Sequence, residues 1–393
     1  MRKTTGVAIV ASGVCPWGPR KATFRDMIAE AGKACFDSNK KIGNTDIQSL
    51  VLSSAMAPRS AHQSAPAPIA CEVLGLQPLF HQNTETQCQS GTIAVRTGAA
   101  FIMAGLVDLV MVVGVEKQLI PSHEEVFINA NSPLDHDWEQ GSGITPPGLF
   151  AFAAVAHMQK YGTTEEQMAM VSVKNHSHSK TNIAAHFRMG TTLEKVMNSR
   201  LIAYPFKLFD CCPQTDGAAA VILASEKKAR ELVDNPVWLM GIGQGWTAHT
   251  SSNIPGDLTD WQGVRLAGQR AYNMAGITPD DVDLAEVHDC FTISEIIQYE
   301  ALGFCKPGEG GKFVETGQSD YGGKVVFSPR GGLIACGHPF GATGVGQAHE
   351  MFLQLGGQAG ERQVKDAKIG LAVTMSGCGT QTSAIVYGSE AAI

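Results

Sequence analysis

The chain has 393 residues, of which 44% are hydrophobic and only 17% are charged, and it contains 43 glycines. This length exceeds one ordinary hydrophobic core, so we expect two or three packed units of a compact α/β protein. The formal net charge is -7, and Lys and Arg form no cluster along the sequence. These features exclude a disordered or fibrous chain and argue against a general nucleic-acid-binding surface.

The apolar stretch near the start, residues 7–10, is too short for a signal peptide or a membrane span. Gly13 and Pro16 follow it, which favours a first β-strand instead. We therefore expect a cytoplasmic protein with no membrane span. Because a reducing compartment keeps thiols free, we expect the ten cysteines to be reduced and any specialised one to be catalytic.

Strands and helices alternate along the first third of the sequence. Residues 6–11 and 47–52 are rich in strand-forming side chains, and residues 24–36 between them place apolar side chains at helical spacing. A helix of small residues at 90–105 and an apolar strand at 109–115 come next. This alternation predicts a largely parallel sheet with helices on its faces.

The pattern changes between residues 116 and 200, where prolines, polar residues and amphipathic helical stretches replace the strands. We interpret this region as an insertion. Strand-like sequence resumes at 218–224, so residues 1–115 together with 201–228 are predicted to form an N-terminal half. Residues 229–393 are predicted to form a C-terminal half.

The two predicted halves share a pattern that favours an internal duplication. In the first half a strand leads to Cys88, then to the small-residue helix and the strand at 109–115. In the second half a strand at 333–336 is expected to lead to His338, then to a helix ending near Leu355 and a strand at 369–374.

Cys88 occurs in Thr-Gln-Cys-Gln-Ser-Gly, where the predicted strand ends and the helix begins. At such a junction free backbone N–H groups and the positive end of the helix dipole point toward the sulfur. We expect this location to lower the pKa of the thiol and to make it a nucleophile. An arbitrary cysteine is more often a small buried side chain, so the assignment depends on the motifs that accompany it.

The segment 331–344 is rich in glycine and contains one imidazole, His338, in Gly-His-Pro-Phe-Gly. Dense glycine lets the backbone approach a ligand closely, and the imidazole can accept the thiol proton of Cys88. A phosphate-binding loop is the alternative. The segment lacks the Lys-Ser/Thr ending of a nucleotide loop and the glycine spacing of the dinucleotide fingerprint, which argues against it.

Two further segments contain residues suited to proton transfer. His288-Asp289-Cys290 near a predicted strand end could be a metal site, but no paired ligands at suitable spacing accompany it, so we favour a catalytic loop and expect no metal. Cys378, between two glycines after an apolar strand, could donate and abstract a proton at the α-carbon of a substrate.

Taken together with residues 209–220, these motifs resemble the thiolase superfamily, and specifically its sterol-carrier-protein-type branch. The resemblance covers almost the whole chain, and His-Asp-Cys-Phe at 288–291 is the form that marks this branch. It implies a thiolase fold: two duplicated βαβαβαββ-type halves in a five-layer α-β-α-β-α arrangement, with residues 116–200 as an inserted loop domain. The implied activity is that of a 3-ketoacyl-CoA thiolase, or acetyl-CoA C-acyltransferase.

By this resemblance Cys88 accepts the acyl group and His338 activates it. His288 and His338 would form the oxyanion hole for the thioester carbonyl that becomes an enolate. Backbone N–H groups of Cys88 and Gly379 would form a second oxyanion hole. Many members of the branch lack Cys378 and use the cysteine at the position of Cys290 as the acid/base. This chain has both, and we assign α-proton transfer to Cys378, with Cys290 able to share or replace it.

The resemblance also implies ligands and partners. Coenzyme A enters as a substrate, in the form of acyl-CoA, and is expected near residues 116–200, with contacts expected within 175–188. A homodimer or a dimer of dimers is implied. Bacterial members of the branch often resemble subunits that pair with a small zinc-ribbon and OB-fold protein, so such a partner is a further expectation.

Other functions are compatible with the same residues. A thiolase subunit acting on an unusual substrate such as benzoylsuccinyl-CoA, a ketoacyl synthase or a carbon acyltransferase would use the same nucleophile. A retro-aldolase of this branch resembles a thiolase that has lost the cysteine, so Cys88 argues against it. A lipid-binding or scaffold subunit with a vestigial site is the alternative from another class, and the intact set of Cys88, His288, His338 and Cys378 argues against it.

Overall fold

A computed structural model describes residues 3–249 and 256–392 of the chain. Within these residues ten strands form one sheet in the order β10-β9-β11-β12-β8-β1-β7-β4-β2-β3. The strands are β1 (Val7–Val14), β2 (Ser49–Ser53), β3 (Phe80–Thr84), β4 (Leu109–Glu116), β7 (Gly217–Ser225), β8 (Val237–Trp246), β9 (Leu284–Glu286), β10 (Val326–Phe327), β11 (Ile369–Ser376) and β12 (Gln381–Gly388).

The sheet consists of two halves with the same topology. The order β3-β2-β4-β7-β1 in one half is repeated as β10-β9-β11-β12-β8 in the other. The halves meet along the antiparallel pair β1–β8, whose register includes Ala8 opposite Trp238 and Ile9 opposite Val237. The duplication predicted from the sequence is therefore confirmed. We retain, as a proposal, the division into residues 1–115 with 201–228, an insertion at 116–200, and residues 229–393.

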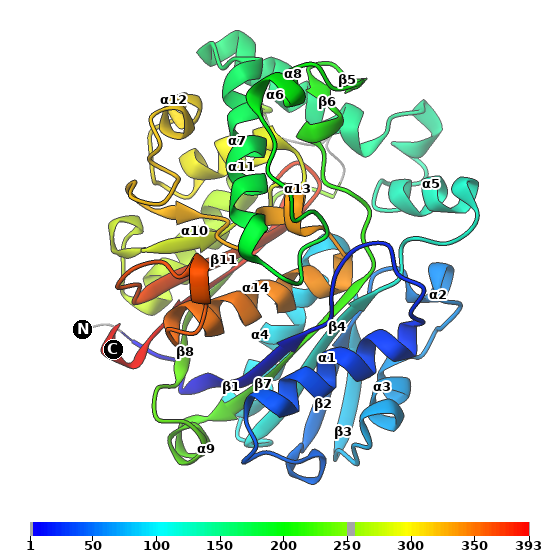
Figure 1. The fold of residues 1–393 in the computed structure, drawn as a ribbon, viewed down its shortest axis with the longest axis vertical. Helices are drawn as coiled ribbons and strands as arrows, with labels where there is room; N and C mark the ends of the chain where they lie inside the picture. Colours follow the sequence, from blue (N-terminus) through cyan, green and yellow to red (C-terminus); the bar gives the residue numbers. More distant parts are fainter. Residues whose placement is uncertain (1–2, 250–255, 393) are drawn as a thin grey trace.

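Helices form three further layers around the half-sheets. Helices α4 (Ser90–Met103) and α14 (Phe340–Leu355) pack against each other and against strands of both halves, so they form the central layer. Helices α1 (Phe24–Ser38) and α3 (Pro66–Leu74) cover one outer face, and α10 (Gln262–Ala275) covers the other, as Figure 1 shows. The expected five-layer arrangement is confirmed.

The inserted region is mainly helical, and shorter elements connect the layers. Helix α7 (Glu165–His178) begins with a capping box at Thr164. The Thr164 hydroxyl accepts from the backbone N–H of Gln167, and the Gln167 side chain accepts from the N–H of Thr164. The remaining elements are α2 (Ala57–Ser60), α5 (His123–Asn131), α6 (Pro146–Tyr161), α7 (Glu165–His178), α8 (Leu193–Met197), β5 (Leu201–Ala203), β6 (Phe206–Lys207), α9 (Glu226–Leu232), α11 (Thr292–Ala301), α12 (Gly310–Glu315) and α13 (Gly332–Cys336).

The prediction of a strand at 333–336 is wrong, because these residues form helix α13. A short apolar stretch fits a buried helix as well as a strand. Two tertiary features favour the helix: Gly331 and Gly332 adopt positive φ angles of 108° and 59°, and the Asp289 carboxylate accepts the backbone N–H groups of Leu333 and Ile334. Strand β10 occupies the place in the second half that β3 occupies in the first.

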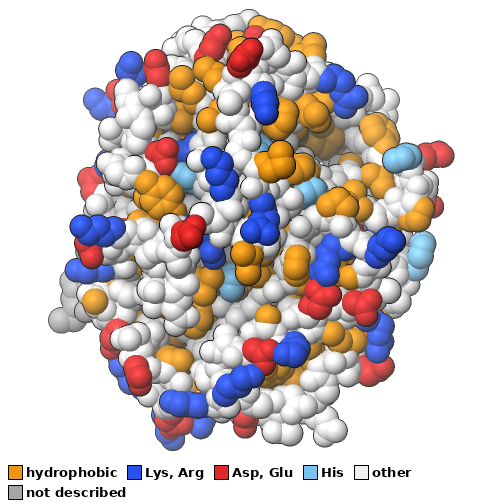
Figure 2. All heavy atoms as spheres, viewed as in Figure 1, with side chains coloured by type: hydrophobic (Ala, Val, Ile, Leu, Met, Phe, Trp, Pro, Cys, Tyr) orange, Lys and Arg blue, Asp and Glu red, His pale blue; other side chains and the backbone are white. Residues whose placement is uncertain are grey.

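The surface agrees with the charge pattern of the sequence. Figure 2 shows acidic and basic side chains interspersed over one face of the molecule. Within the described part of the chain, no helix is both long and apolar enough to cross a membrane.

Helix α10 approaches β8 so closely that glycine is required at three alternate positions of the strand. A Cβ atom at Gly241, Gly243 or Gly245 would lie within 2.1 Å of a backbone carbonyl oxygen of the helix. Neither backbone can move away without disrupting its own hydrogen bonds, so this interface depends on glycine at the three positions.

Gly243→Ala is therefore expected to destabilise the fold by about 3 kcal/mol, since the new methyl group would lie 1.9 Å from the carbonyl oxygen of Ala267. The urea midpoint, followed by circular dichroism, measures the effect. Gly141→Ala is the control, because a Cβ there meets nothing within 4 Å. Its expected change is within about 0.5 kcal/mol. Equal midpoints for the two variants would contradict the packing argument.

Candidate active site

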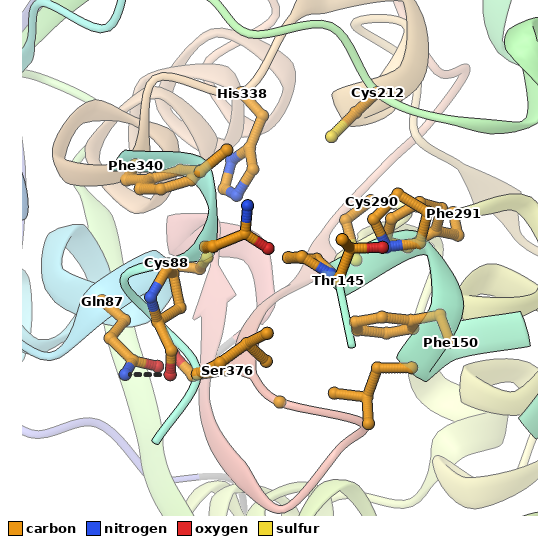
Figure 3. A pocket seen from close by; sticks show the side chains of 18 of the residues that line it. Gln87, Cys88, Thr145, Phe150, Cys212, Cys290, Phe291, His338, Phe340 and Ser376 are labelled. Carbon is orange, nitrogen blue, oxygen red and sulfur yellow. Dashed lines mark hydrogen bonds between the residues drawn. The ribbon is translucent and has the colours of Figure 1, made fainter. Parts of the chain in front are cut away.

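Cys88 lies in a tight turn between β3 and α4. The preceding residue, Gln87, has a φ angle of 56°, which is unusual for a residue with a side chain. Hydrogen bonds hold this conformation: Ser90 Oγ accepts from the Thr86 N–H at 2.9 Å and donates to the Gln87 carbonyl at 2.6 Å. The Gln87 amide also donates to the carbonyl of Pro133 in the insertion (Figure 3). The turn therefore fixes the direction of the thiol.

The thiol lies on a cavity of about 380 Å³ between the insertion and both halves. Cys88, His288, Cys290 and His338 contribute to its wall, and Figure 3 shows His338 and Cys290 pointing into it from opposite sides. Most of the remaining wall is apolar. It includes Leu134, Leu149, Phe150, Ile202, Phe291 and Phe340.

Three of the predicted site residues come together although they lie far apart in the sequence. The Cys88 Sγ atom and one ring nitrogen each of His288 and His338 all lie within 4.8 Å of one another. The two imidazole rings stand edge to face, with centroids 4.8 Å apart at 85°. Both histidines are buried, at 1% and 2% exposure, so their environment is the cavity rather than bulk solvent.

The hydrogen bonds of His338 define its tautomer. Its Nδ1 lies 2.8 Å from the Thr343 Oγ1, and that hydroxyl donates its single proton to the carbonyl of Pro339 at 3.0 Å. Thr343 can then only accept, so Nδ1 carries the ring proton and Nε2 carries a lone pair. Nε2 is buried and has no hydrogen-bond partner among the described residues. It is therefore available as a base.

The protonation states differ in one respect from the sequence prediction. Burial, together with the nearby charge of Glu116, raises the pKa of Cys88 to about 12, so the expectation that the helix end lowers this pKa is wrong. Burial lowers the pKa of His288 to about 3 and holds the pKa of His338 well below its usual range. Both imidazoles are neutral at pH 7, and His338 can accept the thiol proton.

The two candidate acid/base cysteines occupy different environments. Cys290 is buried, contributes to the cavity wall, and places its Sγ 3.8 Å from the Ser294 Oγ. Cys378 is also buried, in the turn between β11 and β12. That turn reaches the described wall of the cavity through Ser376 and Gly377 rather than through Cys378.

The second expected oxyanion hole involves the backbone N–H of Gly379, which has a partner within its own turn. The N–H of Gly379 donates to the carbonyl of Gly377 at 2.9 Å, so it is already engaged. The pairing of this N–H with that of Cys88 in an oxyanion hole stays a prediction.

Two cavity residues were missed by the sequence analysis. Cys211 and Cys212, interpreted there as packing residues, are only partly buried and both contribute to the cavity wall. The N–H of Cys212 donates to the carbonyl of Cys290 at 2.9 Å, which brings the two segments together. The sequence feature that could have indicated a place in the cavity wall was their position before Pro213, in the loop that leads into β7.

Three side chains in the range 175–188, where coenzyme A contacts are predicted, are buried in the structure. His176 and His178 belong to α7 and are buried. Asn175 is fully buried, and its amide donates to Asp289 at 2.7 Å and to Glu295 at 2.8 Å. Asn175 therefore supports the loop that contains His288 and Cys290, and these three side chains are closed to a ligand in solution.

Comparison with known families explains this arrangement. Residues 7–191 match the thiolase N-terminal domain, and residues 244–389 match the thiolase C-terminal domain-like family. The acetyl-CoA acetyltransferase of Methanothermobacter thermautotrophicus is 39% identical over 93% of this chain and 94% of its own length.

The chain belongs to the thiolase family.

Other relatives place this thiolase in the sterol-carrier-protein-type branch. Human sterol carrier protein 2 is 35% identical over 76% of this chain and 56% of its own length. The benzoylsuccinyl-CoA thiolase subunit BbsB of Thauera aromatica is 35% identical over 72% of both chains. The chain is accordingly an acyltransferase.

Solved structures share the fold. The Ltp2-ChsH2(DUF35) aldolase superimposes with a TM-score of 0.84 at 24% identity, covering 99% of both chains. Human mitochondrial 3-ketoacyl-CoA thiolase in complex with CoA gives a TM-score of 0.70 at 19% identity, covering 99% of this chain and 100% of that one.

Replacing Thr343 by valine removes the acceptor of the Nδ1 proton at nearly constant volume. The proton can then move to Nε2, which would no longer accept the proton of Cys88. We expect iodoacetamide to alkylate Cys88 about ten-fold more slowly near neutral pH. Thr343→Ser keeps the hydroxyl and is expected to react within about two-fold of the parent. Mass spectrometry of the Cys88 peptide, with the Cys305 peptide as reference, measures both rates; equal rates for the two variants would refute the tautomer assignment.

Proposed function

We propose that the chain catalyses the reversible cleavage of 3-ketoacyl-CoA by coenzyme A through an acyl thioester on Cys88. The observation that carries this proposal is the group formed by the Cys88 thiol and the two neutral imidazoles on one apolar cavity. A nucleophile, a base and a hydrogen-bond donor are the minimum that thioester chemistry requires.

In the degradative direction the first step is proton transfer from the Cys88 Sγ to the His338 Nε2. The resulting thiolate attacks the 3-keto carbon, and the bond from that carbon to the α-carbon breaks. The electron pair moves to the thioester, which becomes an enolate of acyl-CoA. His338 now has N–H groups at both ring nitrogens, so Nε2–H can donate to the enolate oxygen, together with a ring N–H of His288.

The enolate is then protonated at its α-carbon, and we assign this proton to Cys290. Cys290 contributes to the cavity wall, whereas Cys378 is not among the residues that line it. This reverses the preference drawn from the sequence. Burial raises the pKa of Cys290 well above its usual range, and a protonated thiol is the form that the acid requires.

The proton that His338 took from Cys88 then passes to the Cys290 thiolate, which leaves His338 neutral again. Coenzyme A completes the cycle by attacking the acyl group on Cys88: His338 accepts the thiol proton of the incoming coenzyme and returns it to the departing Cys88 sulfur. The order of events predicts ping-pong kinetics. The same groups perform Claisen condensation in the reverse direction. We place the pantetheine under the insertion at 116–200.

The cavity also suggests which acyl groups are accepted. Phe150, Phe291 and Phe340 offer apolar surface beside the nucleophile, which suits an acyl chain larger than acetyl. A hetero-complex acting on an aromatic acyl-CoA, as the name of the Thauera relative states for that protein, is the second candidate. We further propose a cytoplasmic homodimer that can pair with a small zinc-ribbon and OB-fold protein.

Cys88→Ser tests the acyl-enzyme. After incubation with radiolabelled acyl-CoA and denaturation, the parent protein is expected to retain label and the variant to retain none. Thiolysis of acetoacetyl-CoA is expected to fall about 1,000-fold or more. Cys212→Ser removes another thiol from the same cavity and is expected to keep the label. Label that persists in Cys88→Ser and disappears in Cys212→Ser would transfer the nucleophile to Cys212.

Cys290→Ser and Cys378→Ser test the acid/base. Cys290→Ser is expected to slow exchange of the acetyl-CoA α-hydrogens with deuterated water by about 100-fold. Transfer of the acetyl group between acetyl-CoA and labelled coenzyme A breaks no C–H bond, so it is expected to change by less than about three-fold. Cys378→Ser is expected to keep both reactions. Slow α-hydrogen exchange in Cys378→Ser, with normal exchange in Cys290→Ser, would restore the sequence-based assignment of Cys378.

A further inference from the structure

The three groups that form the proposed catalytic centre also have the composition of a metal site. Within the described part of the chain, they are the one group of three potential ligands close enough to share an ion. Cys88 supplies a sulfur and His288 and His338 supply ring nitrogens. With Zn–N bonds of about 2.0–2.1 Å and a Zn–S bond of about 2.3 Å, tetrahedral ligand atoms stand about 3.3–3.6 Å apart. The observed limit of 4.8 Å therefore requires closure by about 1 Å, which side-chain rotation can supply.

The nitrogens are available to an ion. His338 Nε2 and His288 Nδ1 are both buried, and neither has a hydrogen-bond partner among the described residues. Buried polar atoms without a partner are rare, and both nitrogens keep the capacity to bind a ligand. Thr343 holds the Nδ1–H of His338, which is the arrangement found around histidines that bind metals through their other nitrogen.

The donor set also defines which ions would bind. A thiolate with two imidazoles favours Zn²⁺ and its substitute Co²⁺ over Mg²⁺ or Ca²⁺, which prefer oxygen. The group contains no carboxylate. The cavity leaves a fourth position for water or for the thiol of Cys290, which also lines the cavity.

We propose that the substrate-free enzyme binds one Zn²⁺ ion through Cys88, His288 and His338, and that this ion blocks the nucleophile. Binding displaces one proton from the Cys88 thiol to solvent and leaves a zinc thiolate. No electron is transferred, and a chelator reverses the reaction. Because the acyl-enzyme has no free Cys88 sulfur, acyl-CoA and Zn²⁺ exclude each other. This inhibition rests on the proposed function, whereas the binding does not.

Cobalt chloride, added without oxygen to the purified full-length protein, tests the site by absorption. One Co²⁺ per chain is expected to give a thiolate charge-transfer band in the near ultraviolet and strong visible bands of four-coordinate cobalt. Zinc chloride is expected to remove both. Cys88→Ser is expected to lose the charge-transfer band, while Cys305→Ser, which changes a thiol outside this cavity, keeps it. Absence of the bands in the parent, or their persistence in Cys88→Ser, would overturn the proposal.

Two measurements on the unaltered protein separate this proposal from the proposed function. Zinc chloride is expected to slow alkylation of Cys88 by iodoacetamide, and thiolysis of acetoacetyl-CoA, by about ten-fold at a free concentration about ten times its dissociation constant. Ethylenediaminetetraacetate restores both. Cobalt binding without any thiolysis would refute the function and leave the metal site. Active thiolysis that zinc does not affect would refute the metal site alone.

Discussion

The close contact between α4 and α14 is the constraint on which the site depends. A Cβ atom at Gly91 would lie 2.8 Å from the backbone nitrogen of Gly344, and one at Gly344 would lie 2.2 Å from that of Thr92. Only helices without side chains at these positions approach so closely. Because Cys88 precedes α4 and His338 precedes α14, this contact brings the nucleophile of one half to the base of the other.

Buried carboxylates hold the loops on either side of this contact. Glu116, at the end of β4, accepts from Ser54 Oγ at 2.7 Å and from the N–H of Gly341 at 2.9 Å, and so ties the loop after β2 to the first turn of α14. The Asp289 carboxylate likewise accepts the backbone N–H groups of Leu333 and Ile334 at the start of α13. Each carboxylate is satisfied by several donors, which is the condition under which a buried charge is tolerated. These hydrogen bonds fix the backbone of the loops on which the site is built.

The sequence predicted the parts of this site that depend on neighbouring residues, and it failed for the parts that depend on residues far apart in the chain. The turn at Cys88 and the glycine-rich loop at His338 were found because glycine patterns and strand-to-helix junctions are local. Helix α13 was mistaken for a strand because the carboxylate that begins it, on Asp289, lies more than forty positions away in the sequence. The raised pKa of Cys88 and the place of Cys290 in the cavity wall depend on burial, which no local pattern contains.

Residues 116–200 contribute to the cavity wall and also form hydrogen bonds with the segments around Cys88 and His338. Asn175 of α7 donates to Asp289, and Asp289 accepts the first N–H groups of α13, the helix that precedes the glycine-rich loop of His338. On the other side, the carbonyl of Pro133 accepts from Gln87 beside the nucleophile. Hydrogen bonds thus connect residues 116–200 both to the turn of Cys88 and to the segment that precedes His338. A shift of residues 116–200 would therefore also move Cys88 and His338, because hydrogen bonds join these segments, and the alignment of nucleophile and base depends on this connection.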